Sequence, residues 1–288
     1  MSIYRSQLSK SLVINLYNAQ IAKLDIPYQD IFVETSFGRT HVVEIGNPEG
    51  KPLLVFHGGN STTAYNLLES RFLLEKFHVY AVDIIGHPGK SAENILMPFG
   101  YHYGRWAGEV ISALGYEKIC CLGSSFGGGV LTKLMCIAPS KVERAVLLVP
   151  AGINNAFPAD TAKMIVPLAK YYLTKDEKYM KETAMYMALS EKALKKDFMA
   201  VIKNTLDNVK IHPFMPSNVE MARLHKCKAP ALVMAAEYDC LFPARKVLPK
   251  AKKVLPNCKI HMLKGRGHIP VLRKREKQII VDFLMEES

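Results

Sequence analysis

Hydrophobic and polar positions along the chain follow two patterns, short apolar runs and longer stretches with helical spacing. Eight runs predict β-strands, and they lie at 31–36, 39–44, 53–57, 78–83, 119–123, 145–149, 231–236 and 259–263. From residue 53 onward the runs are mostly apolar rather than alternating, as expected for strands covered on both faces, whereas 39–44 resembles an exposed antiparallel edge. Helical patterns fill most of the intervals, at 62–76, 103–114, 128–138, 244–255 and 271–285.

The order of these elements predicts how they assemble. Strands that alternate with helices form a mainly parallel sheet with helices on both faces, because each parallel connection must cross over the sheet. Residues 151–224 break the alternation, since they show helical patterns and no clear strand. We therefore expect an eight-stranded α/β core built from residues 1–150 and 225–288, with a helical cap (151–224) inserted between strands 6 and 7. Residues 1–20 are expected to form an amphipathic helix rather than a signal peptide.

Composition limits the environment and the partners of the chain. The 288 residues include six cysteines, none in a C-x-x-C pair, so neither a disulfide framework nor a zinc site is expected. Free thiols suit a reducing compartment, and the cytoplasm is the expected location. No run of about 20 apolar residues is present, so no membrane span is expected. No residue pattern predicts a metal or another cofactor, and the sequence does not define an oligomeric state.

The net charge of +12 is unevenly distributed. Residues 245–277 contain twelve Lys or Arg and one acid, Glu276, so this stretch alone carries a charge of +11. Such a surface attracts anionic partners, but the stretch has no Phe, Tyr or Trp to stack on bases, and no nucleic acid is expected. A solvated helical face is the alternative interpretation.

The strongest motif is Gly123-Ser124-Ser125-Phe126-Gly127, which follows an apolar strand and precedes a helix. In a nucleophile elbow, a sharp turn between strand and helix exposes the central side chain, and small residues two positions away on each side prevent backbone clashes. This spacing selects Ser125 rather than Ser124 as the nucleophile. The alternative is a glycine-rich helix start in which Ser125 only caps the helix.

Two backbone N–H groups near the nucleophile are candidates for stabilising an oxyanion. Phe126 follows the nucleophile, so its N–H lies at the start of the helix. A second donor is expected in the loop 57–60 (HGGN), where glycines let the backbone approach a substrate closely. The N–H of Gly59 is the candidate, and the side-chain amide of Asn60 is a candidate for substrate binding. His57 is expected to hold this loop in place rather than to act as a base.

A base and an acid are expected after later strands. Glu237 and Asp239 follow the seventh strand, where Asp239 is placed to accept a hydrogen bond from a histidine and Glu237 is the weaker candidate. His268 lies at the tip of the loop after the last strand, where two glycines let the chain curl back over the site. Arg266 and Lys264 in the same loop suggest that an anionic substrate is attracted to the mouth of the site.

These motifs, together with the segment 83–91 (DIIGHPGKS), resemble the α/β-hydrolase superfamily, and they span nearly the whole chain in the order Ser, Asp, His. The resemblance implies hydrolysis through an acyl-enzyme and a helical cap over the site. One departure is Pro88, which stands where a glycine is usual and affects the shape of a turn rather than the chemistry. In the implied mechanism His268 deprotonates Ser125, Asp239 orients the histidine, and the two N–H groups stabilise the oxyanion.

The expected function is hydrolysis of a carboxylic ester or a related acyl bond in a small, largely apolar acyl substrate. Amide or iminopeptidase, thioester, lactone, carbon–carbon bond and perhydrolase chemistry use the same triad and remain alternatives. Ser125 argues against epoxide hydrolases and haloalkane dehalogenases, whose nucleophile is an aspartate. A different class of function is a ligand-sensing or interaction protein that retains the site with little turnover.

Methionine and tyrosine are frequent in the expected cap. They either line an acyl-binding pocket or pack the cap against itself and the core, and we expect packing for most of them. The residues concerned are Met164, Tyr171, Tyr172, Tyr179, Met180, Met185, Tyr186, Met187 and Met199.

Overall fold

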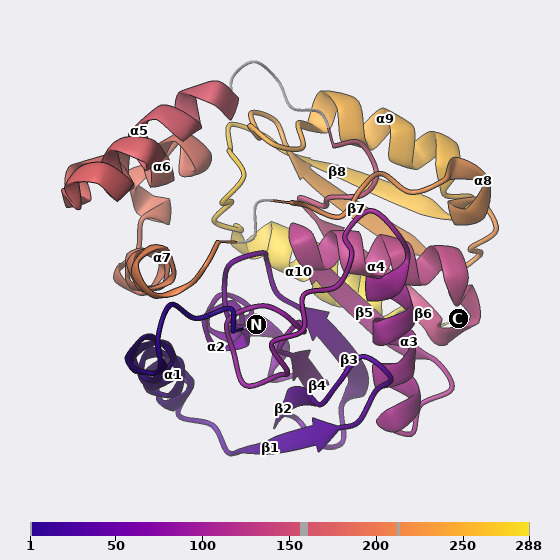
Figure 1. The fold of residues 1–288 in the computed structure, drawn as a ribbon. Coiled ribbons are helices and arrows are strands. Elements are labelled where there is room, and N and C mark those ends of the chain that lie inside the picture. Colours follow the sequence, from indigo (N-terminus) through magenta and orange to yellow (C-terminus); the bar gives the residue numbers. More distant parts are fainter. Residues whose placement is uncertain (1, 156–160, 212–213, 288) are drawn as a thin grey trace.

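The structure, a computed structural model, describes residues 2–155, 161–211 and 214–287 (Figure 1). One eight-stranded sheet forms its centre, in the order β1-β2-β4-β3-β5-β6-β7-β8. Only the β1–β2 and β2–β4 pairings are antiparallel, and the other pairings are parallel. The strands are β1 Tyr28–Val33, β2 Thr40–Gly46, β3 Lys51–Phe56, β4 Phe77–Val82, β5 Ile119–Ser124, β6 Val142–Leu148, β7 Ala231–Ala236 and β8 Cys258–Leu263. The predicted mainly parallel sheet is confirmed.

The interpretation of 39–44 as an exposed edge is wrong. Strand β2 pairs with β1 on one side and with β4 on the other, so the edges of the sheet are β1 and β8. The sequence of β2 contains polar residues that are buried in the structure, where each has a hydrogen-bond partner. Thr40 Oγ1 accepts a hydrogen bond from Trp106 Nε1 at 2.9 Å. His41 Nδ1 likewise lies 2.8 Å from Oδ2 of the buried Asp83. A buried polar group that is hydrogen-bonded is tolerated in a sheet interior.

Helices cover both faces of the sheet and contribute one buried cluster on each. Helices α3, α4 and α9 pack on one face with Leu54 and Phe56, while α1, α2 and α10 pack on the other with Leu53 and Val55. Alternate residues of β3 therefore point to opposite layers, as the two-residue repeat of a strand requires. The helices are α1 Gln7–Ala22, α2 Thr63–Glu69, α3 His102–Ala113, α4 Phe126–Ile137, α9 Ala244–Val254 and α10 Lys274–Met285.

The predicted helices are present, with one difference. The stretch 62–76 is divided into α2 and a single 3-10 turn, η1 (Arg71–Leu73), because the helix ends at Ser70. A second 3-10 turn, η2 (Pro139–Lys141), precedes β6. No helix in the described ranges is long and apolar enough to cross a bilayer.

Between β6 and β7 the described chain is helical. It forms α5 Thr161–Thr174, α6 Glu177–Ala188, η3 Glu191–Ala193, α7 Lys196–Asn208 and α8 Met221–Leu224. Figure 1 shows α5, α6 and α7 beside the sheet, with α7 next to α1. Tyr171, Met180 and Leu206 are buried together in this insertion, which supports packing rather than pocket lining for these residues. We call these helices the cap; the exact division at residues 150 and 225 remains a prediction.

Candidate active site

Ser125 lies at the turn between β5 and α4, with φ 51° and ψ −112°. Positive φ is uncommon for a residue other than glycine, and it is the strained geometry that an elbow requires. Gly127 is needed because a Cβ at this position would overlap the carbonyl oxygen of Phe56, and a Cβ at Gly123 would overlap that of Gly127. The small residues of the motif therefore have the steric role expected from the sequence.

The structure brings Ser125, His268 and Asp239 together. Ser125 Oγ lies 2.9 Å from His268 Nε2, and His268 Nδ1 lies 2.9 Å from Asp239 Oδ2. The other carboxylate oxygen, Asp239 Oδ1, accepts hydrogen bonds from the N–H groups of Leu241 (2.7 Å) and Phe242 (2.9 Å). His268 and Asp239 are 4% and 3% exposed, so these contacts form away from bulk water. The arrangement can move a proton from the serine hydroxyl to the imidazole.

Glu237, the weaker candidate for the acid, has a different partner. Its Oε2 accepts a hydrogen bond from Gly265 N at 2.8 Å, in the loop that carries the histidine. This contact braces the loop and leaves Asp239 as the carboxylate at the imidazole. Within the described residues no group of three or more His, Cys, Asp or Glu side chains could hold a metal ion.

His57 supports the loop that follows β3. Its Nε2 accepts a hydrogen bond from Ile84 N at 3.0 Å, so its Nδ1 carries the proton and donates to Gly58 O at 2.7 Å. The ring is fully buried, and burial lowers the pKa of His57 below its ordinary value. A neutral imidazole with both nitrogens engaged fits the expectation that His57 holds the loop.

Gly59 and Phe126 lie against each other beside the nucleophile. A Cβ built on Gly59 would be 3.1 Å from Phe126 Cβ, and one on Gly58 would be 3.8 Å from Ser125 Cβ. The loop therefore lies directly against the elbow, and Phe126 is the first residue of α4, where backbone N–H groups point out of the helix. The two candidate oxyanion donors therefore belong to neighbouring segments, and their role remains a prediction.

His87 also contributes to this region, a role that was not predicted from the sequence. Its Nδ1 accepts a hydrogen bond from Asn60 N at 3.3 Å, and its ring packs against Phe126 with centroids 4.4 Å apart. Asn60 has a positive φ of 52°, so its backbone conformation needs support from neighbours. The motif 83–91 was the signal that could have identified His87.

Arg266 is not available to attract a substrate, contrary to the interpretation above. Its Nη1 and Nη2 donate to Glu276 Oε2 (2.6 Å) and Oε1 (3.0 Å), and the two side chains are 11% and 9% exposed. Burial alone would raise the pKa of Glu276, but the guanidinium of Arg266 and the Arg273 N–H hold that pKa below its ordinary value. Arg266 O also accepts a hydrogen bond from Tyr238 N at 2.9 Å, next to the acid of the triad.

The cap contacts the histidine loop at the end of α6. Ile269 N donates to Met187 O at 3.4 Å, and a Cβ at Gly267 would overlap the same oxygen. The second glycine of this loop is thus required by the close approach of the cap. Neither Met187 nor Glu276 was identified from the sequence as a neighbour of His268.

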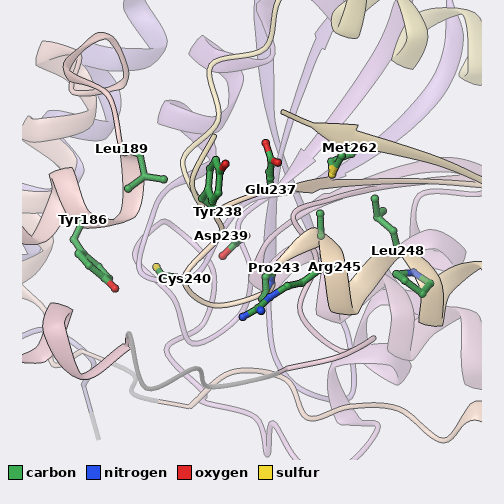
Figure 2. A pocket seen from close by; sticks show the side chains of 12 residues that line it. Tyr186, Leu189, Glu237, Tyr238, Asp239, Cys240, Pro243, Arg245, Leu248 and Met262 are labelled. Carbon is green, nitrogen blue, oxygen red and sulfur yellow. The ribbon is translucent and has the colours of Figure 1, made fainter. Parts of the chain in front are cut away.

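A cavity of about 790 Å³ opens beside Asp239 (Figure 2). Its walls come from the end of α6, the loop after β7, the start of α9 and strand β8. The lining residues are Tyr186, Leu189, Glu237, Tyr238, Asp239, Cys240, Pro243, Ala244, Arg245, Leu248, Pro249 and Met262. Asp239 is among them while Ser125 and His268 are not, so the cavity lies on the Asp239 side of the three contacting side chains rather than around Ser125.

Comparison with known proteins agrees with this geometry. A family described as "alpha/beta hydrolase fold" matches residues 51–185. Carboxylesterase YbfK of Bacillus subtilis is 25% identical over 93% of this chain and 92% of its own length. An uncharacterized carboxylesterase, nap, of the same organism is 26% identical over 88% and 85%.

The likeness extends to three dimensions. The crystal structure of carboxylesterase CesB (YbfK) from Bacillus subtilis superimposes with a TM-score of 0.82, covering 96% of this chain and 98% of that chain at 22% identity. The sheet order, the elbow between β5 and α4, and the helical insertion after β6 belong to one architecture. The chain has the α/β-hydrolase fold.

Proposed function

We propose that this protein hydrolyses carboxylic esters through an acyl-enzyme formed on Ser125. The observation that carries the proposal is the continuous contact from Ser125 Oγ to His268 and on to Asp239, with both separations at 2.9 Å. The positive φ of Ser125 adds support, because the surrounding packing maintains a conformation that has no use in a simple helix cap.

In the proposed mechanism His268 Nε2 takes the hydroxyl proton while Ser125 Oγ attacks the ester carbonyl carbon. The N–H groups of Gly59 and Phe126 stabilise the oxyanion of the tetrahedral intermediate, which collapses as His268 returns the proton to the leaving alcohol. A water molecule activated by the same histidine then hydrolyses the acyl-serine. Asp239 holds the imidazole with its Nδ1 protonated throughout.

The relatives favour esters among the possible acyl substrates. Two of them, YbfK and nap, are named carboxylesterases and align over most of this chain. We therefore expect a small-molecule ester with a largely apolar acyl group, and we place Asn60 among the residues that contact it. The six cysteines are free thiols, which suits a reducing compartment such as the cytoplasm.

The direct test is intact-mass analysis after treatment with a fluorophosphonate. The wild-type protein should gain one adduct, while Ser125→Ala, with an unchanged circular-dichroism spectrum, should gain none. Ser124→Ala is the matched control and should still be labelled, because Ser124 lies beside Ser125 but has no role in the proposed reaction. Labelling of Ser125→Ala to the same extent as wild type would reject the assigned nucleophile.

A substrate panel separates ester hydrolysis from the other chemistries of the triad. Esters, thioesters and amides with one acyl group are compared by kcat/KM, and the proposal predicts the highest value for an oxygen ester. Labelling by the fluorophosphonate without multiple turnovers on any panel member would instead favour the ligand-sensing alternative.

A further inference from the structure

The cavity beside Asp239 has the size and lining of a ligand site. A volume of about 790 Å³ lies within the roughly 300–1,000 Å³ that small-molecule pockets occupy. Three large apolar side chains on its wall remain exposed: Tyr238 (60%), Leu189 (47%) and Met262 (37%). Contact with an apolar ligand would remove this surface from water, which is favourable.

The charged groups of the cavity are not equivalent. Glu237 already accepts a hydrogen bond from Gly265 N, and both oxygens of Asp239 are engaged. Arg245 is exposed and forms no hydrogen bond or ion pair with any residue that the structure describes. In Figure 2 its side chain extends from the first turn of α9 toward the side of the cavity where Tyr186 lies. Glu237 and Asp239 keep their negative charge, and Arg245 is the charged lining residue whose side chain has no described partner and can pair with an anionic ligand.

The surroundings reinforce the positive charge of Arg245. Helix α9 carries five cations (Arg245, Lys246, Lys250, Lys252 and Lys253) and no acid. A concentration of one sign of charge next to a cleft raises the local concentration of ligands of the opposite sign. A guanidinium is also well suited to bind a carboxylate through two parallel hydrogen bonds.

From these observations we infer that the cavity holds the non-reacting arm of the substrate, an apolar chain or ring that ends in a carboxylate bound by Arg245. This inference rests on the proposed ester hydrolysis at Ser125. The reacting carbonyl lies at Ser125, the arm passes the loop of Asp239, and its apolar part covers Tyr238 and Leu189. The natural substrate is then an ester of an amphiphilic acid with an anionic end rather than of a purely apolar acid.

The test compares two p-nitrophenyl esters of equal chain length, the neutral hexanoate and the monoester of adipic acid, which ends in a carboxylate. Arg245→Ala should lower the ratio of kcat/KM for the adipate ester to that for the hexanoate about tenfold, as expected for loss of one charge-assisted contact. Arg245→Lys should retain part of the ratio. Lys246→Ala removes an exposed cation from the same helical turn outside the cavity and should leave the ratio unchanged.

Binding without turnover separates this inference from the proposed function. Calorimetric titration of the wild-type protein with octanoate and with octanamide should show tighter binding of the anion, and Arg245→Ala should weaken octanoate binding about tenfold. Octanoate binding that depends on Arg245 in a protein that hydrolyses neither ester would reject the esterase proposal and keep the cavity assignment. Ester hydrolysis with the same ratio in wild type and Arg245→Ala, or equal loss in the Lys246→Ala control, would overturn the cavity assignment.

Discussion

Arg266 and Glu276 form a two-pronged ion pair that connects the histidine loop to the first turn of α10. Arg266 lies two residues before His268, and both partners of the pair are largely buried, so the pair fixes the base of that loop in a region with little solvent screening. The carbonyl of Arg266 also accepts the Tyr238 N–H, which links the histidine loop to the loop of the acid. One residue thus connects three segments that must stay in register for the triad to form.

Replacing Arg266 by Met should lower kcat on the order of 10- to 100-fold with a small change in KM, because misplacing a reacting group by about 1 Å has an effect of this size. The protein should also lose about 3–5 kcal/mol of stability, because Glu276 would be left as an unpaired, largely buried charge. Steady-state kinetics and urea unfolding measure the two effects.

The double variant Arg266→Met/Glu276→Leu distinguishes positioning from general stability. Replacing both partners of a buried pair by apolar residues often restores stability, but it does not restore the directed contact. We expect stability to recover while kcat stays low. Lys264→Met, an exposed cation in the same loop, should change neither quantity. Full recovery of kcat in the double variant would mean that the pair acts only through folding.

The reach of sequence analysis here depends on whether a contact is local or tertiary. The elbow was predictable because the strand, the turn at Ser125 and the helix are consecutive, so one short motif contains the whole geometry. Asp239 and His268 were predictable because each directly follows a strand, and the carboxyl ends of parallel strands meet at one edge of the sheet. The eight strands themselves followed from apolar runs, with boundaries shifted by a few residues.

The contacts that hold the site were not predictable in the same way. In the sequence Glu276 is the single acid of a basic stretch. Its pairing with Arg266 depends on how α10 packs against the sheet, which the sequence does not show. His87 and Asn60 are brought together by loops that follow different strands. Strand β2 was misassigned as an edge because its buried His41 has polar partners in other segments, Asp30 on β1 and Asp83 directly after β4. Periodicity indicates which positions face inward, but it does not identify their polar partners.

Gly267→Ala should impair catalysis through the cap. The added Cβ would overlap Met187 O, a backbone atom that cannot move without shifting the end of α6 or the histidine loop. We expect kcat to fall at least tenfold and the rate of fluorophosphonate labelling to fall in parallel, because both require the Ser125–His268 contact. Gly108→Ala in α3 is the matched control: its Cβ would meet only ordinary contacts of 3.6 Å or more, so activity should be unchanged. A wild-type labelling rate in Gly267→Ala would contradict the close contact.

His57→Ala should weaken the loop that carries Gly59. The change leaves Ile84 N and Gly58 O without their partner, and each unpaired buried group costs about 1–3 kcal/mol. Because a displaced oxyanion donor affects the transition state more than substrate binding, we expect a loss in kcat on the order of 100-fold with a smaller change in KM.

The conservative variant His57→Gln tests the same idea with folding held closer to wild type. Its amide can both donate and accept, so it should recover part of kcat and of stability. Because burial lowers the pKa of His57 and its Nε2 accepts a hydrogen bond from Ile84 N, we expect the acid limb of the pH–rate profile to retain its midpoint in both variants. A shift of that limb in His57→Gln would indicate that His57 titrates during catalysis, contrary to the hydrogen bonds seen here.

Lys133, in the helix that follows the nucleophile, should give the protein a characteristic pH dependence. The side chain is buried (1% exposed), and its Nζ donates to Gly100 O at 2.6 Å and to Ser217 Oγ at 3.2 Å. Burial lowers the pKa of Lys133 from 10.5 to about 8. The unfolded chain therefore binds more protons than the folded protein between these two values, and this lysine makes the free energy of unfolding rise with pH across that window.

Lys133→Met isolates this contribution, because buried cysteines with raised pKa, such as Cys136, act in the opposite direction in the same pH range. The quantity to measure is the difference in Tm between variant and wild type at pH 7, 8, 9 and 10. The Tm of the variant relative to wild type should be highest below about pH 8, where wild type holds a charged, buried ammonium. This relative Tm should fall by a few degrees as pH rises, because wild type then gains stability that the variant does not. Lys141→Met, which removes an exposed hydrogen bond to Ser112, should give a difference that does not vary with pH. A constant difference for Lys133→Met as well would mean that the hydrogen bonds of Lys133 to Gly100 and Ser217 keep its ammonium protonated across this pH range.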